Sequence, residues 1–153
     1  MKVLGIDPGL KGALVFIDGA SVTIFDTPVV SGDYNIVAMA RIIRESAPDF
    51  AFIERVHSMP GQGVSSSFKF GVGYGIWKGI LGALGVSTIY VTPQEWKRKF
   101  SLISKPKDES RLRAIEIFPE LEPELRLKKD CDRADALLIA YYGAVVYGKT
   151  RES

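Results

Sequence analysis

The sequence has very few residues that carry sulfur or imidazole chemistry. Among its 153 residues there is one cysteine, Cys131, and one histidine, His57. A lone cysteine excludes a disulfide framework within the chain and is typical of a reducing compartment. Structural zinc sites need about four cysteine or histidine ligands, so these two residues are weak zinc candidates. The sequence assigns neither of them a role.

Long apolar runs are also missing. The most hydrophobic segment covers residues 71–86, but it contains Lys78 and six glycines. It is also shorter than the roughly 20 residues that cross a bilayer as a helix. The start Met1-Lys2-Val3 lacks the pattern of a secretory leader. We therefore expect a cytoplasmic protein with no membrane partner.

The remaining composition is that of a folded globular protein. Hydrophobic residues make up 46% of the chain and charged residues 25%, which excludes a disordered chain. We find no internal repeat, and the length is that of one ordinary domain. The sequence therefore predicts a single domain that spans residues 1–153.

Charge is distributed unevenly along the chain. Residues 54–111 hold nine Lys or Arg against four Asp or Glu, whereas the segments on both sides are slightly acidic. A basic surface next to acidic groups is typical of a protein that binds a polyanion beside a cation site. A merely solvated basic face explains the same pattern equally well.

Two predicted strands each end in a carboxylate. The apolar run Val3–Ile6 ends in Asp7, and Pro8-Gly9 then turns the chain into the next apolar run. Residues 49–53 repeat this pattern and end in Glu54. We expect residues 1–27 to form three antiparallel strands, 28–33 a loop and 34–46 a helix. A strand that follows a helical crossover usually lies parallel to its predecessor, so Asp7 and Glu54 are predicted at the same sheet edge.

A second pair of acids opens the last predicted helix, about 132–147. Asp132 and Asp135 are three residues apart and share one helix face. Taken alone, such a pair caps the helix or offsets its dipole, and Asp7 alone is a turn former. One divalent-metal site, however, accounts for all four acids together, because Mg²⁺ prefers oxygen ligands and four crowded carboxylates repel one another without it. Two metal ions held in this way catalyse phosphodiester hydrolysis.

These features resemble a known family. The segments 5–9 (Gly-Ile-Asp-Pro-Gly) and 132–137 (Asp-Arg-Ala-Asp-Ala-Leu), together with the strand-end Glu54, are similar to the RuvC family of Holliday junction resolvases. Residues 59–67 resemble its shorter, phage-type members. The resemblance implies an α/β ribonuclease H-like fold, with a central five-stranded mixed sheet flanked by helices. It also implies a homodimeric endonuclease, in a bacterial or phage-infected cell, that makes paired symmetric nicks in four-way DNA. Asp7, Glu54, Asp132 and Asp135 become its catalytic acids and the ligands of two Mg²⁺ ions, for which Mn²⁺ can substitute; no small-molecule cofactor is implied.

The predicted DNA contacts lie mainly in the basic middle of the chain. The first group surrounds the start of the helix predicted over about 64–84, where backbone amides favour phosphate. The second lies on the short helix that opens at Thr92 and on the basic linker after it. Better-known bacterial members have an aromatic a few residues after the glutamate, where this chain has His57. The contacts that we predict are Arg55, His57, Gln62, Ser65, Ser66, Lys69, Lys97, Arg98, Lys99, Lys105 and Lys107.

Three glycines at a spacing of four residues mark a close helix contact. Gly71, Gly75 and Gly79 lie inside the predicted helix 64–84, and each costs about 1 kcal/mol relative to alanine. Close approach of another helix explains them, either within the chain or across a dimer interface. The resemblance favours the dimer.

Other functions fit parts of the sequence. A ribonuclease or a YqgF-like RNA-processing nuclease has the same fold, and a catalytically silent junction-binding protein needs the acids only for structure. An actin-like ATP-binding domain opens with a motif similar to Gly5–Gly9. The chain is short for that two-lobed architecture and has no Walker-type phosphate loop.

Overall fold

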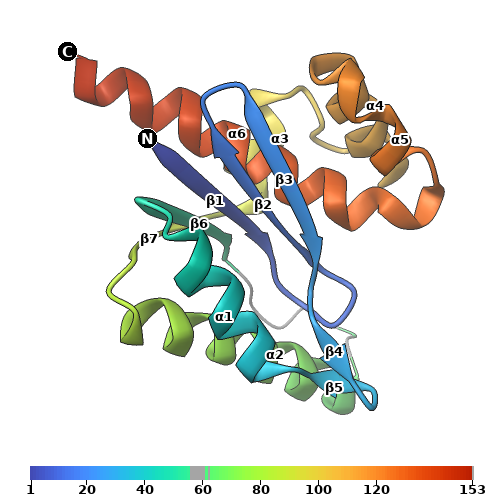
Figure 1. Ribbon diagram of the computed structural model, residues 1–153. Helices are drawn as coiled ribbons and strands as arrows, with labels where there is room; N and C mark the ends of the chain where they lie inside the picture. The colour runs from blue at the N-terminus through green and yellow to red at the C-terminus, as the bar shows by residue number, and fades with distance from the viewer. Residues whose placement is uncertain (56–60, 62, 153) are drawn as a thin grey trace.

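The computed structural model describes residues 1–55, 61 and 63–152, and it is built around one mixed sheet (Figure 1). Its five strands are β1 (Lys2–Asp7), β2 (Ala13–Asp18), β3 (Ser21–Asp26), β6 (Phe50–Glu54) and β7 (Ser87–Val91). Their order is β3-β2-β1-β6-β7. The first three strands are antiparallel, and β6 and β7 run parallel to β1. This confirms the predicted five-stranded mixed sheet.

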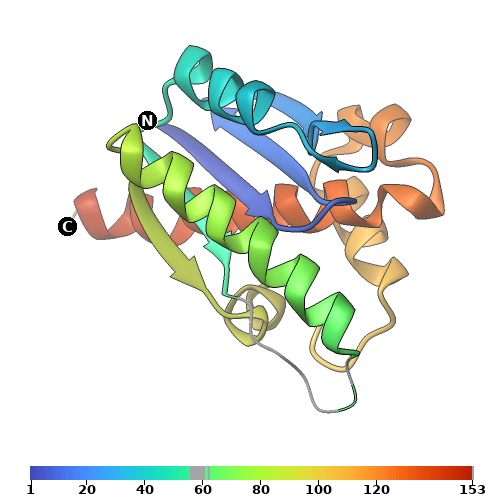
Figure 2. The same ribbon diagram turned by 90° about the horizontal axis from the view of Figure 1, so that it is seen from below.

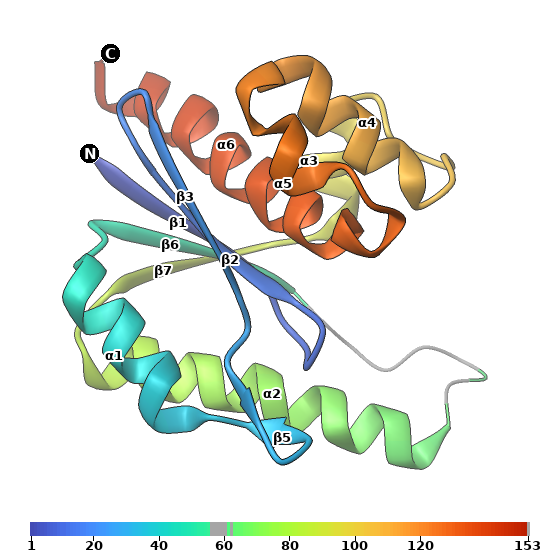
Figure 3. The same cartoon turned by 45° about the vertical axis from the view of Figure 1, so that its right-hand side comes forward.

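Helices cover both faces of the sheet (Figure 3). On one side lie α1 (Ile36–Ser46) and α2 (Val64–Ala83), which Figure 2 shows running across the sheet. On the other side lie α3 (Pro93–Lys99), α4 (Asp108–Ile117), α5 (Glu122–Leu125) and the long α6 (Cys131–Glu152). Short 3-10 turns, η1 (Pro119–Leu121) and η2 (Lys128–Asp130), precede α5 and α6.

The alternation of side chains along the strands creates two cores. In β1, Leu4 and Ile6 pack toward α1 and α2, whereas Val3 packs toward α6. Successive side chains of a strand point to opposite faces, so a strand buried on both sides reads as a continuous apolar run. The run Val3–Ile6 therefore predicted a central strand correctly.

Local signals account for the helix boundaries. The Asn35 side chain accepts a hydrogen bond from Ala38 N at 3.1 Å at the start of α1, and Ala47 ends that helix in the left-handed conformation. Thr92 and Glu95 form the reciprocal capping box of α3, as their spacing indicated. Among the described residues, no helix is long and apolar enough to cross a membrane.

One local prediction was wrong. Residues 28–33 were expected to be a loop, but β4 (Val29–Val30) and β5 (Asp33–Tyr34) form a small separate hairpin. Its turn is formed by Ser31 and Gly32, which both have positive φ. Strands of two residues leave almost no periodicity in a sequence, so the pattern gave no signal.

Candidate active site

The parallel pairing of β1 with β6 sets two carboxylates side by side. Ile6 lies opposite Ile53 in this pairing, so the next residues, Asp7 and Glu54, leave the sheet at the same edge. Both strands are buried up to these positions and partly exposed at them. This is the placement that the two strand ends predicted.

The start of α6 brings the other two acids to the same edge. Helix α6 packs along β1 and β2, and its first turns carry Asp132 and Asp135. One ligand oxygen from each of Asp7, Asp132 and Asp135 lies within 4.8 Å of the other two. Asp7 is therefore grouped, at the spacing of a cation site, with two residues that lie more than 120 positions further along the chain.

Glu54 lines the same cavity but is held by a tryptophan. Trp96 is fully buried, and its Nε1 donates a hydrogen bond to Glu54 Oε2 at 2.7 Å. The contact joins residues 42 positions apart. It fixes one carboxylate oxygen of Glu54, and the residue itself lines the cavity.

Burial and mutual repulsion disfavour the ionised form of these carboxylates. The pKa of Asp7 is raised well above its ordinary value, first by burial and then by the charges of Asp135, Glu54 and Asp132. Burial also raises the pKa of Glu54, although the hydrogen bond from Trp96 opposes this shift. The pKa of Asp135 is raised from 3.8 to about 6, chiefly by burial. A cation in this group would relieve the cost of ionising all of them.

A lysine side chain places a positive charge beside these carboxylates. Lys107 Nζ lies 2.8 Å from Asp132 Oδ1, and the lysine side chain is 66% exposed. Burial acts to lower the pKa of Lys107, but the hydrogen bond and the charge of Asp132 outweigh it and raise the pKa. A flexible ammonium at this point partly balances the acids and can withdraw without disturbing the core.

The acids open into a cavity of about 610 Å³. Besides the four carboxylates, its walls come from the β1–β2 turn, from Phe70 of α2 and from the segment after α3. Its basic residues are Lys11, Lys97, Lys105 and Lys107. The donor set of carboxylate oxygens fits a hard divalent cation such as Mg²⁺ or Ca²⁺ and does not fit a metal that needs sulfur or imidazole.

The predicted DNA contacts lie in several separate places. Lys97, Lys105 and Lys107 border the acidic cavity, whereas Arg98 and Lys99 are exposed on α3 outside it. Ser65 and Lys69 line a different hollow, of about 310 Å³, between α2 and the β4–β5 hairpin. Arg55 and Ser66 are exposed, and His57 and Gln62 lie outside the described residues.

Sequence reasoning missed several residues of the cavity. They are Phe70, Lys11 and Ser110, which line it, together with the buried Trp96, which does not line it but holds Glu54. Ser110 acts to lower the pKa of Asp135, opposing its rise, and its Oγ donates a hydrogen bond to Lys107 O at 3.0 Å. None of the four belongs to a local motif, because each reaches the site through the packing of α2, α3 or α4 or through the β1–β2 turn.

The three predicted interface glycines have no neighbour in the described structure. A Cβ built on Gly71, Gly75 or Gly79 would meet nothing within 4 Å, so close helix packing within the described chain is excluded for them. The tight position is Gly73, where the Tyr34 hydroxyl occupies the space of a side chain. Val64, Phe68 and Val72 are exposed by 88%, 72% and 39%. Each is seven residues from one of the three glycines, so all six share one exposed face of α2.

Comparison with known proteins gives both a sequence and a structural likeness. No family model matches the chain. The chain is 35% identical over 92 residues, 60% of its length, to the chloroplastic Holliday junction resolvase MOC1 of Chlamydomonas reinhardtii. The matched region is 10% of that relative, so this chain spans only a small part of it.

The solved structures that match cover nearly the whole chain. Thermus thermophilus RuvC aligns with a TM-score of 0.65 and 21% identity over 99% of this chain and 97% of that one, and RuvC in complex with a Holliday junction substrate aligns equally well. The fowlpox virus Holliday junction resolvase aligns with a TM-score of 0.59 and 13% identity over 99% of each chain. The chain therefore has the ribonuclease H-like fold of RuvC, and it resembles the Holliday junction resolvases in sequence.

Proposed function

We propose that the protein is a divalent-metal-dependent endonuclease that resolves four-way DNA junctions by paired symmetric nicks. The observation that carries this proposal is the grouping of Asp7, Asp132 and Asp135 with Glu54 in one open cavity bordered by lysines. The fold and the sequence likeness to resolvases support the junction as the substrate. The domain that carries this activity would span residues 1–153.

In this proposal Asp7, Glu54, Asp132 and Asp135 hold two Mg²⁺ ions, and Mn²⁺ can replace them. Bound metal supplies Lewis-acid activation of the attacking water and stabilises the leaving 3′ oxygen. The chain's own residues hold and orient the ligands. Trp96 fixes the Glu54 carboxylate, and α6 presents Asp132 and Asp135 together. Lys107 is released from Asp132 when the acids are neutralised, and its ammonium is then free for a substrate phosphate.

The test is cleavage of a synthetic mobile four-way junction in Mg²⁺, with nick positions mapped on all four strands. We expect nicks at symmetric positions in two opposing strands, and none in a linear duplex of the same sequence. Strong cleavage of an RNA–DNA hybrid with no action on junctions would instead identify a ribonuclease. Tight junction binding without nicks in Mg²⁺ or Mn²⁺ would identify a junction-binding protein.

Metal binding should depend on pH through Asp135. Its pKa is raised to about 6, so the charged form costs folding free energy in the metal-free protein. That cost is absent below about pH 4, grows as the pH rises toward 6 and is fully present above it. Saturating Mg²⁺, at about 100 times its dissociation constant, should raise the melting temperature by roughly 5–10 °C at pH 7.5, and clearly less at pH 5.

Two separate Asp-to-Asn variants, one inside the site and one outside it, provide the comparison for this measurement. Asp135→Asn should lose most of the Mg²⁺ stabilisation at pH 7.5, because the group can no longer ionise. Asp18→Asn, an exposed position at the end of β2, should retain it. An equal Mg²⁺ shift at pH 5 and pH 7.5 in the unmodified protein would contradict this account of the site.

We also propose that two copies associate through the exposed face of α2. An apolar stripe that the described chain leaves largely exposed at Val64 and Phe68, next to glycines that admit close backbone approach, fits a self-complementary helix pair. We expect a dimer in analytical ultracentrifugation at micromolar concentrations, and a monomer for Phe68→Asp. Leu112→Asp, at an exposed apolar position of α4 in the opposite layer, is the matched control and should remain dimeric. A monomeric unmodified protein would disprove the interface.

A further inference from the structure

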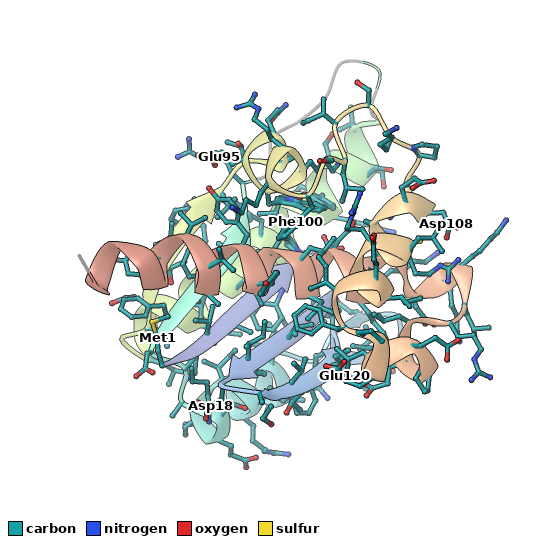
Figure 4. The ribbon with its side chains drawn as sticks, turned by 90° about the horizontal axis from the view of Figure 1, so that it is seen from above. Met1, Asp18, Glu95, Phe100, Asp108 and Glu120 are labelled. Carbon is teal, nitrogen blue, oxygen red and sulfur yellow. The ribbon has the colours of Figure 1, made fainter. Side chains whose placement is uncertain are left out.

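A second hollow continues the acidic cavity in one direction. It has a volume of about 750 Å³ and lies between the β1–β2 turn and the η2–α6 junction. Leu10, Lys11, Gly12, Lys107 and Asp132 line both hollows, so the two form one continuous groove. The labelled Asp108, at the start of α4, borders the second hollow (Figure 4). A chain-like ligand whose reacting group sits at the acids can therefore extend into this hollow.

The acids of the second hollow, Asp26, Asp108, Asp130 and Asp132, each lie beside a cationic side chain. Arg133 pairs with Asp26 and lies 3.8 Å from Asp130, Arg111 pairs with Asp108, and Lys107 pairs with Asp132, so their repulsion of an anion is reduced. The contacts are Arg133 Nε to Asp26 Oδ1 at 2.7 Å, Arg111 Nε to Asp108 Oδ1 at 2.8 Å, Lys107 Nζ to Asp132 Oδ1 at 2.8 Å, and Leu127 N to Asp130 Oδ2 at 2.9 Å.

Three lysines of the hollow have no such partner. Lys11, Lys128 and Lys129 are exposed, and none forms an ion pair with the described residues. Lys11 comes from the β1–β2 turn, and the other two come from η2. The hollow therefore presents three lysines outside ion pairs. Lys128 and Lys129 act on the already paired Asp108 and Asp26 only through longer-range attraction, and the three ammonium groups attract a phosphate-rich ligand.

The backbone that carries these lysines is held in place. The β1–β2 turn is closed by Gly12 N to Gly9 O at 3.1 Å and tied to the end of β3 by Thr27 N to Gly12 O at 3.0 Å. The η2 turn is closed by Asp130 N to Leu127 O at 2.9 Å. Only the side chains need to be ordered when an anion binds, so the entropic cost of forming the site is small.

We propose that Lys11, Lys128 and Lys129 bind the backbone phosphates of the nucleic-acid strand on one side of the reacting phosphate. This rests on the proposed function, because it places the reacting phosphate at the four acids. Lys97 and Lys105 line the acidic cavity and not the second hollow, so they contact the strand elsewhere. Lysines bind phosphate as point charges and read no bases. The groove therefore fixes the direction of the strand without adding sequence preference.

The first test is the salt dependence of junction binding. Each neutralised phosphate contributes about 0.9 to the slope of log K against log salt on duplex DNA. Lys128→Ala/Lys129→Ala should lower the slope by about 1.5–2, which corresponds to roughly 30–100-fold weaker binding at 0.1 M salt. Arg41→Ala/Arg44→Ala removes two exposed charges from α1, on the other layer, and is the matched control with an unchanged slope. An unchanged slope in the lysine variant would overturn the proposal.

A second test locates the phosphates on the strand. Neutral methylphosphonate linkages are placed one to three positions on either side of the nicked phosphate. On one side of the nicked phosphate, these neutral linkages should weaken binding by the unmodified protein about tenfold. The same linkages should hardly change binding by the triple variant Lys11→Ala/Lys128→Ala/Lys129→Ala. Equal losses in both proteins at every position would show that the lysines bind some other anion, and would overturn the proposal.

These outcomes distinguish failure of the groove assignment from failure of the proposed function. If the unmodified protein nicks junctions but the lysine variant keeps its slope, only the groove assignment fails. If the unmodified protein binds junctions without nicking, the function fails and the salt slope still decides the groove. If it binds no nucleic acid, both fail.

Discussion

Asp7→Asn is expected to reduce junction cleavage at least about 10³-fold while junction binding is retained. Asp7 lies at the end of a central strand, and its oxygen is within 4.8 Å of ligand oxygens of Asp132 and Asp135. Removing its charge weakens metal binding where the metal contributes several kcal/mol to stabilising the transition state. The measurement is single-turnover cleavage of a four-way junction in Mg²⁺, with binding measured in Ca²⁺.

The same substitution should stabilise the metal-free protein. The pKa of Asp7 is raised chiefly by burial, so at pH 7.5 its ionised form costs folding free energy without metal. Asn has nearly the same shape and no charge, so the variant should melt above the unmodified protein in EDTA. Asp18→Asn, at the exposed end of β2, should change neither cleavage nor melting. Cleavage above a tenth of the unmodified rate would show that Asp7 is not a metal ligand.

The sequence predicted the edge where the acids meet because every step of that argument is local. An apolar run that ends in a carboxylate gives a strand end, and the helix between the two strands makes them parallel. The pairing of Ile6 with Ile53 confirms both steps. The shared helix face of Asp132 and Asp135 was predicted from helical spacing alone. Their proximity to Asp7 requires, in addition, only that α6 packs on β1.

Contacts between distant elements could not be predicted in this way. The hydrogen bond from Trp96 to Glu54 depends on how α3 packs against β6, and Trp96 reads in the sequence as an ordinary core residue. Charge counts along the sequence do not show which lysines are paired, for a related reason. Lys107 is paired with Asp132, whereas Lys128 and Lys129, which we did not select, have no ion pair among the described residues. Pairing depends on tertiary geometry, so only the structure separates free charges from neutralised ones.

The sequence also could not show which side of α2 faces the core. Its apolar residues lie around most of the helix, and the buried positions are Gly73, Trp77, Ile80 and Leu81. Val64 and Phe68 remain exposed because α2 extends beyond the end of β1 and β6, as Figure 2 shows. The glycine spacing predicted a close helix contact. None is present at these positions within the described chain, so the dimer contact stays a prediction.

Gly5 links the fold directly to the site, and Gly5→Ala should damage both. Helix α6 crosses β1 at this residue, and a Cβ on Gly5 would overlap the backbone of Ala136 and Ala140. Backbone atoms cannot move aside as a flexible side chain can, so α6 must shift away from the sheet. Overpacking of this kind costs about 2–3 kcal/mol, which corresponds to a fall in melting temperature of roughly 5–10 °C for a chain of this size.

The shift of α6 should also reduce catalysis in the molecules that remain folded. Asp132 and Asp135 lie one turn or less before Ala136 on the same helix, so they move with it relative to Asp7. Misplacement of catalytic groups by about 1 Å costs on the order of 10²-fold in rate, and we expect that loss at a temperature where circular dichroism shows the variant folded. Gly82→Ala, where the added methyl meets nothing within 4 Å, is the control and should gain stability by about 1 kcal/mol with unchanged cleavage. A Gly5→Ala variant as stable and active as the unmodified protein would mean that α6 does not rest on β1 as closely as this packing requires.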